Sequence, residues 1–211
     1  MNISRLLSVA PMMERTDRHC RYFFRLLSQQ TLLYSEMINA NAITKGNKTR
    51  LLNFSEIEHP LALQIGGSDP KLLAEATKIG VDWGYDEINL NVGCPSSRVS
   101  SGDFGAVLMK RKDHVAKCVD AMAQFSSNVP ISVKCRIAVD DQDPEKILPS
   151  FIKTVSNSGV SIFIIHARKA ILSGLSPKDN RKIPPIDYNL VKKIKTQFPQ
   201  LEICLNGEIK D

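Results

Sequence analysis

The sequence of 211 residues has no long apolar segment and no pattern of paired cysteines. No apolar run approaches the roughly 18 residues that cross a bilayer, so no membrane contact is expected. The five cysteines lack Cys-x-x-Cys spacing, which argues against a disulfide framework and against a metal site. No Gly-x-Gly-x-x-Gly follows the first apolar run, which argues against a Rossmann domain. The apolar stretch 6–13 contains Pro11 and runs into charged residues, unlike a signal peptide.

The composition is that of an ordinary globular chain. Hydrophobic residues make up 43% and charged residues 24%, which excludes bulk disorder. Lysine and arginine number 28 against 22 acidic residues, and the resulting net charge of +6 is compatible with a polyanionic partner. Unpaired cysteines indicate a reducing compartment, so we expect a cytoplasmic protein.

Short apolar runs alternate with amphipathic segments along the whole chain. Seven runs of strand length are predicted at 6–12, 32–36, 61–64, 88–91, 131–134, 162–166 and 203–206. Helices are predicted between them at 19–29, 69–79, 112–125, 144–156 and 187–197. Asp143 before Pro144 is the expected start of one of these helices.

This alternation predicts an α/β domain that spans residues 1–211. Polar residues end nearly every predicted strand, which favours a TIM-type (β/α)8 barrel over a doubly wound sheet. A closed barrel needs eight strands and about 250 residues. We therefore expect seven parallel strands in a barrel that lacks its last strand and helix.

The most informative segment is 89–96, in which Cys94 stands between a glycine and a proline. A thiol with a pKa of about 8.5 is mostly protonated near neutrality, which suits a proton donor. A neighbouring cation or helix N-terminus would instead favour a nucleophilic thiolate. A small buried apolar role is the third interpretation.

Two cations, Lys134 and Arg136, close the fifth run and lie on one face because strand side chains alternate. A buried lysine needs an anionic or polar partner, such as a phosphate, a flavin carbonyl or a carboxylate. The alternative is an ordinary ion pair with Glu36 or with an acidic residue of 140–143.

Other strands also end in polar residues. His166 closes the sixth run, Gln64 the third and Asn206 the seventh. Amides both donate and accept hydrogen bonds, so they can bind the edge of a planar heterocycle. Gly207 would allow close backbone approach. A structural histidine and ordinary turn chemistry are the alternatives.

A basic segment, 168–182, follows His166 and contains Arg168, Lys178 and Arg181. Cations clustered in a loop at the barrel rim can bind a nucleic-acid backbone while a base enters the pocket. The alternative is a solvated surface loop.

These residues together resemble the tRNA-dihydrouridine synthases, most closely the A type. Segment 85–96, which contains Cys94, is typical of the family, and segment 166–181 points to the A type. The resemblance begins at Leu6 and includes APMM (10–13), SEMI (35–38), LQIGG (63–67), YDEINLNVGCPS (85–96), HARKA (166–170), GLSPK (174–178) and NR (180–181).

The resemblance implies a flavin-binding barrel, which the family follows with a small helical tRNA-binding domain that we expect to be absent here. It implies that FMN is bound by Pro11, Met12, Met13, Gln64, Lys134, His166, Asn206, Gly207 and Glu208. It implies that the target base or the tRNA is contacted by Asn91, Arg136, Arg168, Lys178 and Arg181. It also implies that a complete protein would be a monomer.

The implied reaction is reduction of uridine to 5,6-dihydrouridine in the D-loop of tRNA, at positions 20/20a. NADPH would reduce FMN, which would deliver hydride to C6 of the base while Cys94 protonates C5. Lys134 and His166 would stabilise the charge that develops.

The sequence departs from the family pattern in two places. Glu208 replaces a frequent glycine, and a carboxylate there would repel phosphate if it pointed inward. The chain also stops before an eighth strand and before the phosphate-binding turn that follows it. An unclosed sheet leaves two edges, so we expect the 211-residue chain alone to bind FMN weakly or not at all and to aggregate.

Two other functions stay open. A flavin barrel could reduce a free pyrimidine, in the manner of a dihydroorotate dehydrogenase, although the basic segment 168–182 has no use there. The chain could also be an inactive fragment or a tRNA-binding remnant without flavin.

Overall fold

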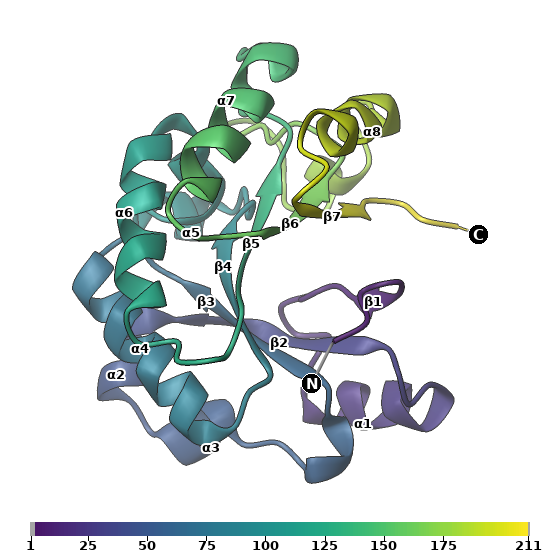
Figure 1. Cartoon of the computed structure of the whole chain (residues 1–211). Coiled ribbons are helices and arrows are strands. Elements are labelled where there is room, and N and C mark those ends of the chain that lie inside the picture. Colours follow the sequence, from purple (N-terminus) through teal and green to yellow (C-terminus); the bar gives the residue numbers. More distant parts are fainter. Residues whose placement is uncertain (1–2, 211) are drawn as a thin grey trace.

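A computed structural model describes residues 3–210 as an open β/α barrel (Figure 1). Seven strands of this part of the chain pair in parallel, each with its successor in the sequence. This confirms the predicted barrel with seven parallel strands. The strands are β1 (Ser8–Val9), β2 (Leu32–Asn39), β3 (Leu61–Gly66), β4 (Glu87–Val92), β5 (Ile131–Arg136), β6 (Ile162–His166) and β7 (Glu202–Asn206).

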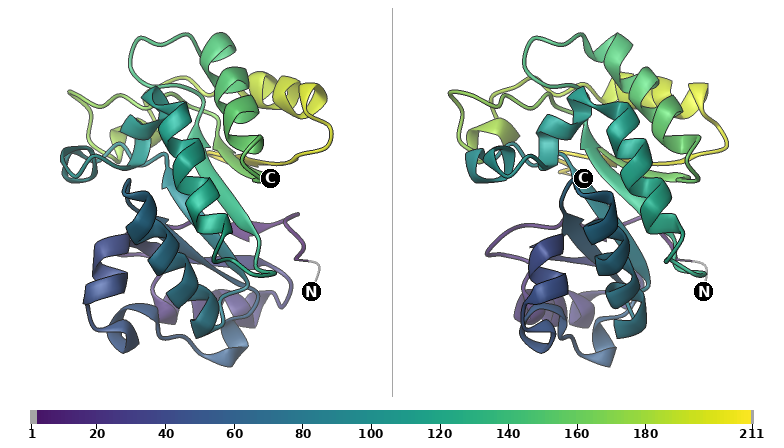
Figure 2. Two further views of the ribbon diagram at one scale, coloured as in Figure 1. Left: turned by 60° about the vertical axis from the view of Figure 1, so that its left-hand side comes forward. Right: turned by 90° about the vertical axis from the view of Figure 1, so that its left-hand side faces the viewer.

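Helices cover the outer face of the curved sheet, and Figure 2 shows the longer ones running along it. Helices α4, α6 and α7 pack against one another in that order. The α-helices are α1 (Arg18–Leu27), α2 (Ala40–Lys45), α3 (Lys48–Leu52), α4 (Pro70–Trp83), α5 (Ser97–Ser101), α6 (Lys112–Ala123), α7 (Pro144–Ser156) and α8 (Tyr188–Gln197). Short 3-10 helices are η1 (Glu56–Glu58), η2 (Gly105–Lys110) and η3 (Asp179–Arg181). No helix within residues 3–210 is long and apolar enough to cross a membrane.

The five predicted helices are present, and α7 has the predicted bounds. Helices α2, α3 and α5 were not predicted, because segments of five or six residues are too short to show a helical period.

Local side-chain chemistry starts the two best-defined helices. A carboxylate oxygen of Asp69 accepts from the backbone N–H groups of Lys71 and Leu72, at 2.8 and 3.1 Å. Asp143 accepts from the N–H of Glu145 at 3.0 Å in the same way. Each aspartate is followed by a proline at the start of the helix, where the missing N–H costs nothing.

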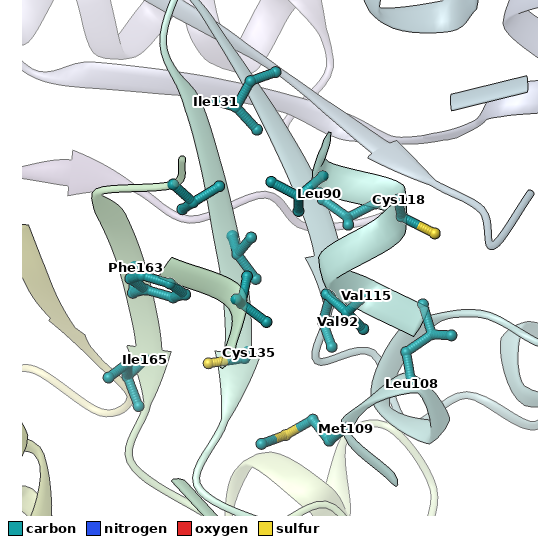
Figure 3. Close-up of a cluster of buried hydrophobic side chains, with 14 of the residues drawn as sticks. Leu90, Val92, Leu108, Met109, Val115, Cys118, Ile131, Cys135, Phe163 and Ile165 are labelled. Atoms are coloured by element: carbon teal, nitrogen blue, oxygen red, sulfur yellow. The ribbon is translucent and has the colours of Figure 1, made fainter. Parts of the chain in front are cut away.

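The core lies between the sheet and the helices, and Figure 3 shows the part around β4 and α6. Leu90 and Val92 of β4 are fully buried together with Val115 and Cys118 of α6. On β4, the residues that alternate with Leu90 and Val92 are polar and face the barrel interior. The outer face of the strand therefore builds the core, and its inner face is left for polar groups.

The first strand is shorter than predicted. The run 6–12 was expected to be extended, but β1 covers Ser8–Val9. It pairs on one side, with β2, and Pro11 lacks a donor to continue a ladder. The chain then turns, with the N–H of Arg15 donating to the carbonyl of Met12 at 3.1 Å.

The barrel is open between β1 and β7, which form the two edges of the sheet. A cleft of about 850 Å³ lies there. Its lining includes Pro11 and Tyr34 from one side, and Lys134, Asn206 and Gly207 from the other. The cleft therefore reaches from the barrel interior to the carboxyl ends of β5 and β7.

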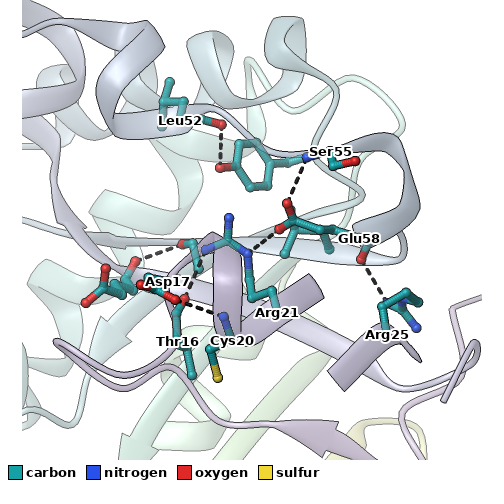
Figure 4. Close-up of polar contacts among 12 residues, drawn as sticks. Thr16, Asp17, Cys20, Arg21, Arg25, Leu52, Ser55 and Glu58 are labelled. Carbon is teal, nitrogen blue, oxygen red and sulfur yellow. Dashed lines mark hydrogen bonds and ion pairs between the residues drawn. The ribbon is translucent and has the colours of Figure 1, made fainter. Parts of the chain in front are cut away.

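Helix α1 buries charge and exposes apolar surface (Figure 4). Arg21 forms an ion pair with Glu58 of η1 at 2.6 Å, with both side chains nearly inaccessible. Arg25 donates to the carbonyl of Glu58 at 2.8 Å. Phe23 and Leu26 face outward and are 57% and 62% exposed. The buried ion pair joins α1 to η1, and Phe24 of α1 packs against the core.

Candidate active site

Strand register brings the predicted site residues to one edge of the barrel. Asn91 of β4 lies beside Lys134 of β5. Arg136, two residues further along β5, lies beside His166 of β6, which lies beside Asn206 of β7. Parallel strands place their carboxyl ends at the same edge, and barrel active sites form there.

Cys94 follows β4 in a turn that its neighbours fix. The side-chain oxygen of Asn91 accepts from the backbone N–H groups of Gly93 and Cys94, at 3.1 and 3.0 Å. Burial raises the pKa of the Cys94 thiol, and the nearby charges of Arg136 and Lys134 oppose this rise. The sulfur therefore carries its proton near neutral pH, as a proton donor requires.

Lys134 is half-buried and lines the cleft. Its ammonium donates to the side-chain oxygen of Asn206 at 2.8 Å. Burial, and then the charge of Arg136, lower the pKa of Lys134 to about 8. An ammonium with a neutral amide as its partner is ready to bind an anion or a carbonyl oxygen.

The alternative of an ordinary ion pair for Lys134 and Arg136 is wrong. Glu36 accepts from the backbone N–H of Glu14. Asp140 binds the ammonium of Lys110 at 2.7 Å. Within residues 3–210, no carboxylate lies within ion-pair distance of Lys134 or Arg136, and Glu36 and Asp140 have other partners.

His166 is 8% exposed and surrounded by positive charge. Burial, then the charges of Arg136 and Lys134, lower its pKa to about 2, so the imidazole is neutral. Its Nδ1 is buried without a hydrogen-bond partner. Gly207 packs on the ring at φ +113°, and a Cβ there would lie 3.3 Å from ring atoms. A neutral ring with an unused nitrogen can bind a polar ligand group.

Arg136 is 4% exposed, and its predicted contact with tRNA stays a prediction. Its guanidinium donates to the carbonyls of Gly93, Lys169 and Asn180, at 3.2, 3.1 and 2.8 Å. Little of its surface is left for a phosphate. The side chain instead ties the cysteine turn to the loop after β6.

Arg168 is also 4% exposed, and its contact with tRNA likewise stays a prediction. It donates to the carbonyl of Pro184 at 2.5 Å and forms an ion pair with Glu208. The carboxylate of Glu208, at φ +50°, is thereby paired with a cation. This pairing answers the concern that Glu208 would repel phosphate.

Lys178 and Arg181 lie exposed on the loop that contains η3. Asn180, fully buried between them, holds the loop: its side chain accepts from the N–H of Ile171 and donates to the carbonyl of Ile171. The two cations are thus displayed by an ordered loop. Their contact with tRNA stays a prediction.

Of the three N-terminal residues predicted to contact a flavin, one lines the cleft and two do not. Pro11 lines the cleft. Met12 is half-buried in the turn, where its N–H donates to the hydroxyl of Thr16 at 3.0 Å. Met13 is 55% exposed and is not part of the cleft lining. The structure therefore places one of the three residues at the cleft.

The sequence interpretation missed Glu87, Asn89 and Ser132, which form a row of polar groups inside the barrel together with the predicted Gln64 and Asn91. Glu87, Asn89 and Asn91 alternate on β4, and Gln64 and Ser132 meet them from β3 and β5. The signal was present, because polar residues at every second position of a buried strand face one side. Within residues 3–210, no group of three or more His, Cys, Asp or Glu residues could hold a metal ion.

Comparison with known proteins gives one family. The family model for dihydrouridine synthase matches residues 8–211. A tRNA-dihydrouridine(20/20a) synthase of Synechocystis sp. is 59% identical over 203 residues, covering 96% of this chain and 60% of the relative. A protein of the same name from Salmonella typhi is 58% identical over 204 residues, covering 96% and 61%. The chain thus spans about 60% of the length of these curated relatives.

Solved structures show the fold independently. Morphinone reductase superposes with a TM-score of 0.67 at 10% identity, covering 97% of this chain and 76% of that one. An old yellow enzyme homologue from Zymomonas mobilis gives 0.66 at 11% identity, covering 97% and 78%. At this identity the likeness shows the β/α-barrel fold alone.

Proposed function

Because the chain belongs to the dihydrouridine synthase family, we propose that its barrel reduces uridine in tRNA to 5,6-dihydrouridine, with FMN as cofactor and NADPH as reductant. The observation that carries the proposal is the Cys94 thiol, which burial keeps protonated beside Lys134 at the carboxyl edge. The names of the curated relatives support the D-loop positions 20/20a.

The edge fits a flavin in several respects. Lys134 has a neutral partner in Asn206, and His166 keeps a buried nitrogen unused. Gly207 lets the ring of His166 pack against the backbone, where a Cβ would lie 3.3 Å from ring atoms. We propose that these residues, with Gln64 and Pro11, hold FMN. When bound and reduced, FMN supplies the hydride that adds to C6 of the base.

The chain's own residues supply the rest of the chemistry. Hydride addition to C6 breaks the C5=C6 bond and leaves negative charge shared between C5 and the carbonyl oxygen. The thiol of Cys94 transfers its proton to C5, which completes the addition. The ammonium of Lys134 stabilises the negative charge that develops, and the resulting thiolate recovers a proton from water.

A tRNA partner is supported by the two exposed cations of the η3 loop, Lys178 and Arg181. Cations at the rim can bind phosphates while a base is turned into the pocket, and an unpaired loop uridine needs the least energy to turn. We propose that Arg136 and Arg168 support this loop from within. We further propose that the chain is a single flavin-binding domain, that the protein is cytoplasmic, and that its complete form is a monomer.

The test compares substrates on the 211-residue chain. The chain is incubated with NADPH, unmodified tRNA, and FMN at concentrations high enough to fill an open cleft. Mass spectrometry of the digested tRNA is expected to show uridines that have gained two hydrogens. Reduction of free uracil or orotate instead of tRNA would favour a free-pyrimidine reductase. Flavin binding without any reduced product would refute the proposed reaction.

Two variants of the η3 loop and one control variant test the tRNA contact. Lys178→Ala and Arg181→Ala remove exposed cations, and Lys192→Ala removes an exposed cation on α8 away from the loop. The first two are expected to weaken tRNA binding and to lower its salt dependence, with little effect from the third. Equal effects from all three would contradict a specific role for the η3 loop.

A further inference from the structure

A column of hydrogen-bonded side chains crosses the barrel interior from bottom to top. At its base lies Glu87, fully buried, which accepts from the hydroxyl of Ser132. Ser132 accepts from the side-chain nitrogen of Asn89 at 2.7 Å, and Asn89 accepts from the nitrogen of Gln64 at 2.7 Å. Gln64 accepts from the nitrogen of Asn91 at 2.8 Å. The column thus joins a buried carboxylate to the turn that holds Cys94.

In every hydrogen bond of this column the donor lies above and the acceptor below. The carboxylate of Glu87 at the lower end requires this direction. The other carboxylate oxygen of Glu87 accepts from Arg5, at 2.9 Å from Nε and 2.5 Å from Nη2. A carboxylate donates nothing, so the proton of Ser132 must point down toward Glu87. The oxygen of Ser132 must then accept from above, which turns the nitrogen of Asn89 downward.

The top of the column requires the same direction. The backbone N–H groups of Gly93 and Cys94 can only donate, so the oxygen of Asn91 must face them. The nitrogen of Asn91 then faces Gln64, whose own nitrogen must face Asn89. Both ends therefore fix one orientation for all three amides, and neither end leaves an amide free to turn over.

This direction decides what Asn91 offers to a ligand. Its oxygen already accepts two hydrogen bonds, from Gly93 and Cys94. One hydrogen of its nitrogen is given to Gln64. What is left is a single N–H donor and no acceptor, which suits a carbonyl oxygen and does not suit an amino group. A uracil carbonyl meets this requirement, whereas the amino group of a cytosine does not.

We propose that Glu87, held by Arg5, is a positioning residue that fixes the direction of the amide column, so that Asn91 presents a donor to the base and holds the Cys94 turn. This assignment rests on the proposed function for its substrate and on the hydrogen bonds alone for its mechanism. Ser132 and Asn89 transmit the direction and do not touch the ligand.

The sharpest perturbation is Glu87→Gln. Arg5 can only donate, so the new amide must turn its oxygen toward Arg5 and its nitrogen toward Ser132. The proton of Ser132 then has no acceptor unless Asn89 turns over. A turned Asn89 turns Gln64 and then Asn91, which would bring two donors together at the Cys94 turn. The effect of the change is thus expected far from the changed residue.

Hydrogen exchange of the Gly93 and Cys94 backbone amides, in the chain without flavin or tRNA, measures this effect. We expect Glu87→Gln to speed their exchange about tenfold relative to the amides of β5, the change expected for loss of about one hydrogen bond. Taking β5 as reference removes any change in global stability. The control Tyr34→Phe deletes another hydrogen bond to Glu87, of 3.0 Å, and should change the ratio less than about twofold.

Adding Arg5→Met to Glu87→Gln distinguishes a reversed direction of the hydrogen bonds from a general disturbance of the structure. Without Arg5 the amide at position 87 can turn its oxygen back to Ser132, so we expect the ratio to return to within about threefold of that in Arg5→Met alone. A merely structural role for Glu87 predicts that the double variant is at least as disturbed as Glu87→Gln, and that result would overturn the proposal. So would unchanged exchange in Glu87→Gln.

If Glu87→Gln does not fold, the proposal is tested on the unaltered chain by NMR. Nuclear Overhauser contacts from the side-chain NH2 of Asn89 should reach the β-protons of Ser132, and contacts to Gln64 instead would overturn the proposal. None of these measurements needs flavin or tRNA. A failed reductase assay with an intact column would therefore count against the proposed function and not against this inference.

Discussion

Replacing Lys134 with methionine is expected to stabilise the ligand-free chain at neutral pH, although we place Lys134 in the flavin site. Methionine keeps the apolar stem of the side chain and removes the ammonium, which is held among other cations with Asn206 as its hydrogen-bond partner. A shift of the lysine pKa from 10.5 to about 8 corresponds to a penalty of about 3 kcal/mol on the charged form. Water in the cleft and the lost hydrogen bond reduce the expected gain to about 1–2 kcal/mol in the free energy of unfolding.

The sign of the pH dependence follows from the direction of the shift. Lys134 has a lower pKa in the folded than in the unfolded chain, so below about pH 8 both forms are charged and the penalty is complete. Between about pH 8 and 10.5 the unfolded chain binds more protons, so the stability of the unaltered chain rises relative to that of the variant. The advantage of Lys134→Met should therefore disappear across this range.

Urea denaturation followed by circular dichroism measures both free energies, at about pH 7 and about pH 10. Lys192→Met, on the exposed face of α8, serves as the control for removing one positive charge. We expect Lys134→Met to be the more stable chain at the lower pH and to bind FMN more weakly at both. A variant that is less stable at neutral pH, or an advantage that does not change with pH, would refute the reasoning.

Three further results are expected. Arg21→Met should lower the free energy of unfolding by about 3 kcal/mol, because it leaves the buried carboxylate of Glu58 unpaired. In urea denaturation, adding Glu58→Leu to this variant should recover part of the lost stability. A loss below about 1 kcal/mol in Arg21→Met would contradict this. Gly207→Ala should weaken FMN binding in a fluorescence titration, since a Cβ at φ +113° would lie 3.3 Å from the ring of His166 and would displace it. Unchanged affinity would show that the position of this ring does not matter for FMN. Iodoacetamide should alkylate Cys94 slowly at neutral pH, and peptide mapping should show the rate rising at a higher pH than for a free cysteine, because burial raises the pKa of its thiol. Fast alkylation at neutral pH would indicate a thiolate.

The sequence predicted correctly those elements whose ends are set by residues close together in the chain. The segment Asp143-Pro144 starts α7 as expected, because capping is a contact between neighbours in the sequence. β6 ends at His166 as expected, because an apolar run stops there. β1 could not be predicted correctly, since its length depends on an edge partner and not on its own apolar residues.

The site was predictable at the level of strand ends and less so for individual partners. Lys134 and His166 were placed at one edge because every strand of a parallel barrel ends there. For Arg136 and Arg168 the sequence shows the charge and does not show the backbone carbonyls that surround it. The role of Glu87 could not be seen either, because a hydrogen-bond direction belongs to a chain of contacts between three strands.

The central claim is that the Cys94 thiol donates the proton while the flavin donates the hydride. Its most direct test is a stopped-flow comparison of the FMN-loaded chain with Cys94→Ala. Reduction of the flavin by NADPH should proceed alike in both, and reoxidation of the reduced flavin by unmodified tRNA should be at least about a hundredfold slower in Cys94→Ala. Equal rates of reoxidation in the two proteins would contradict the account.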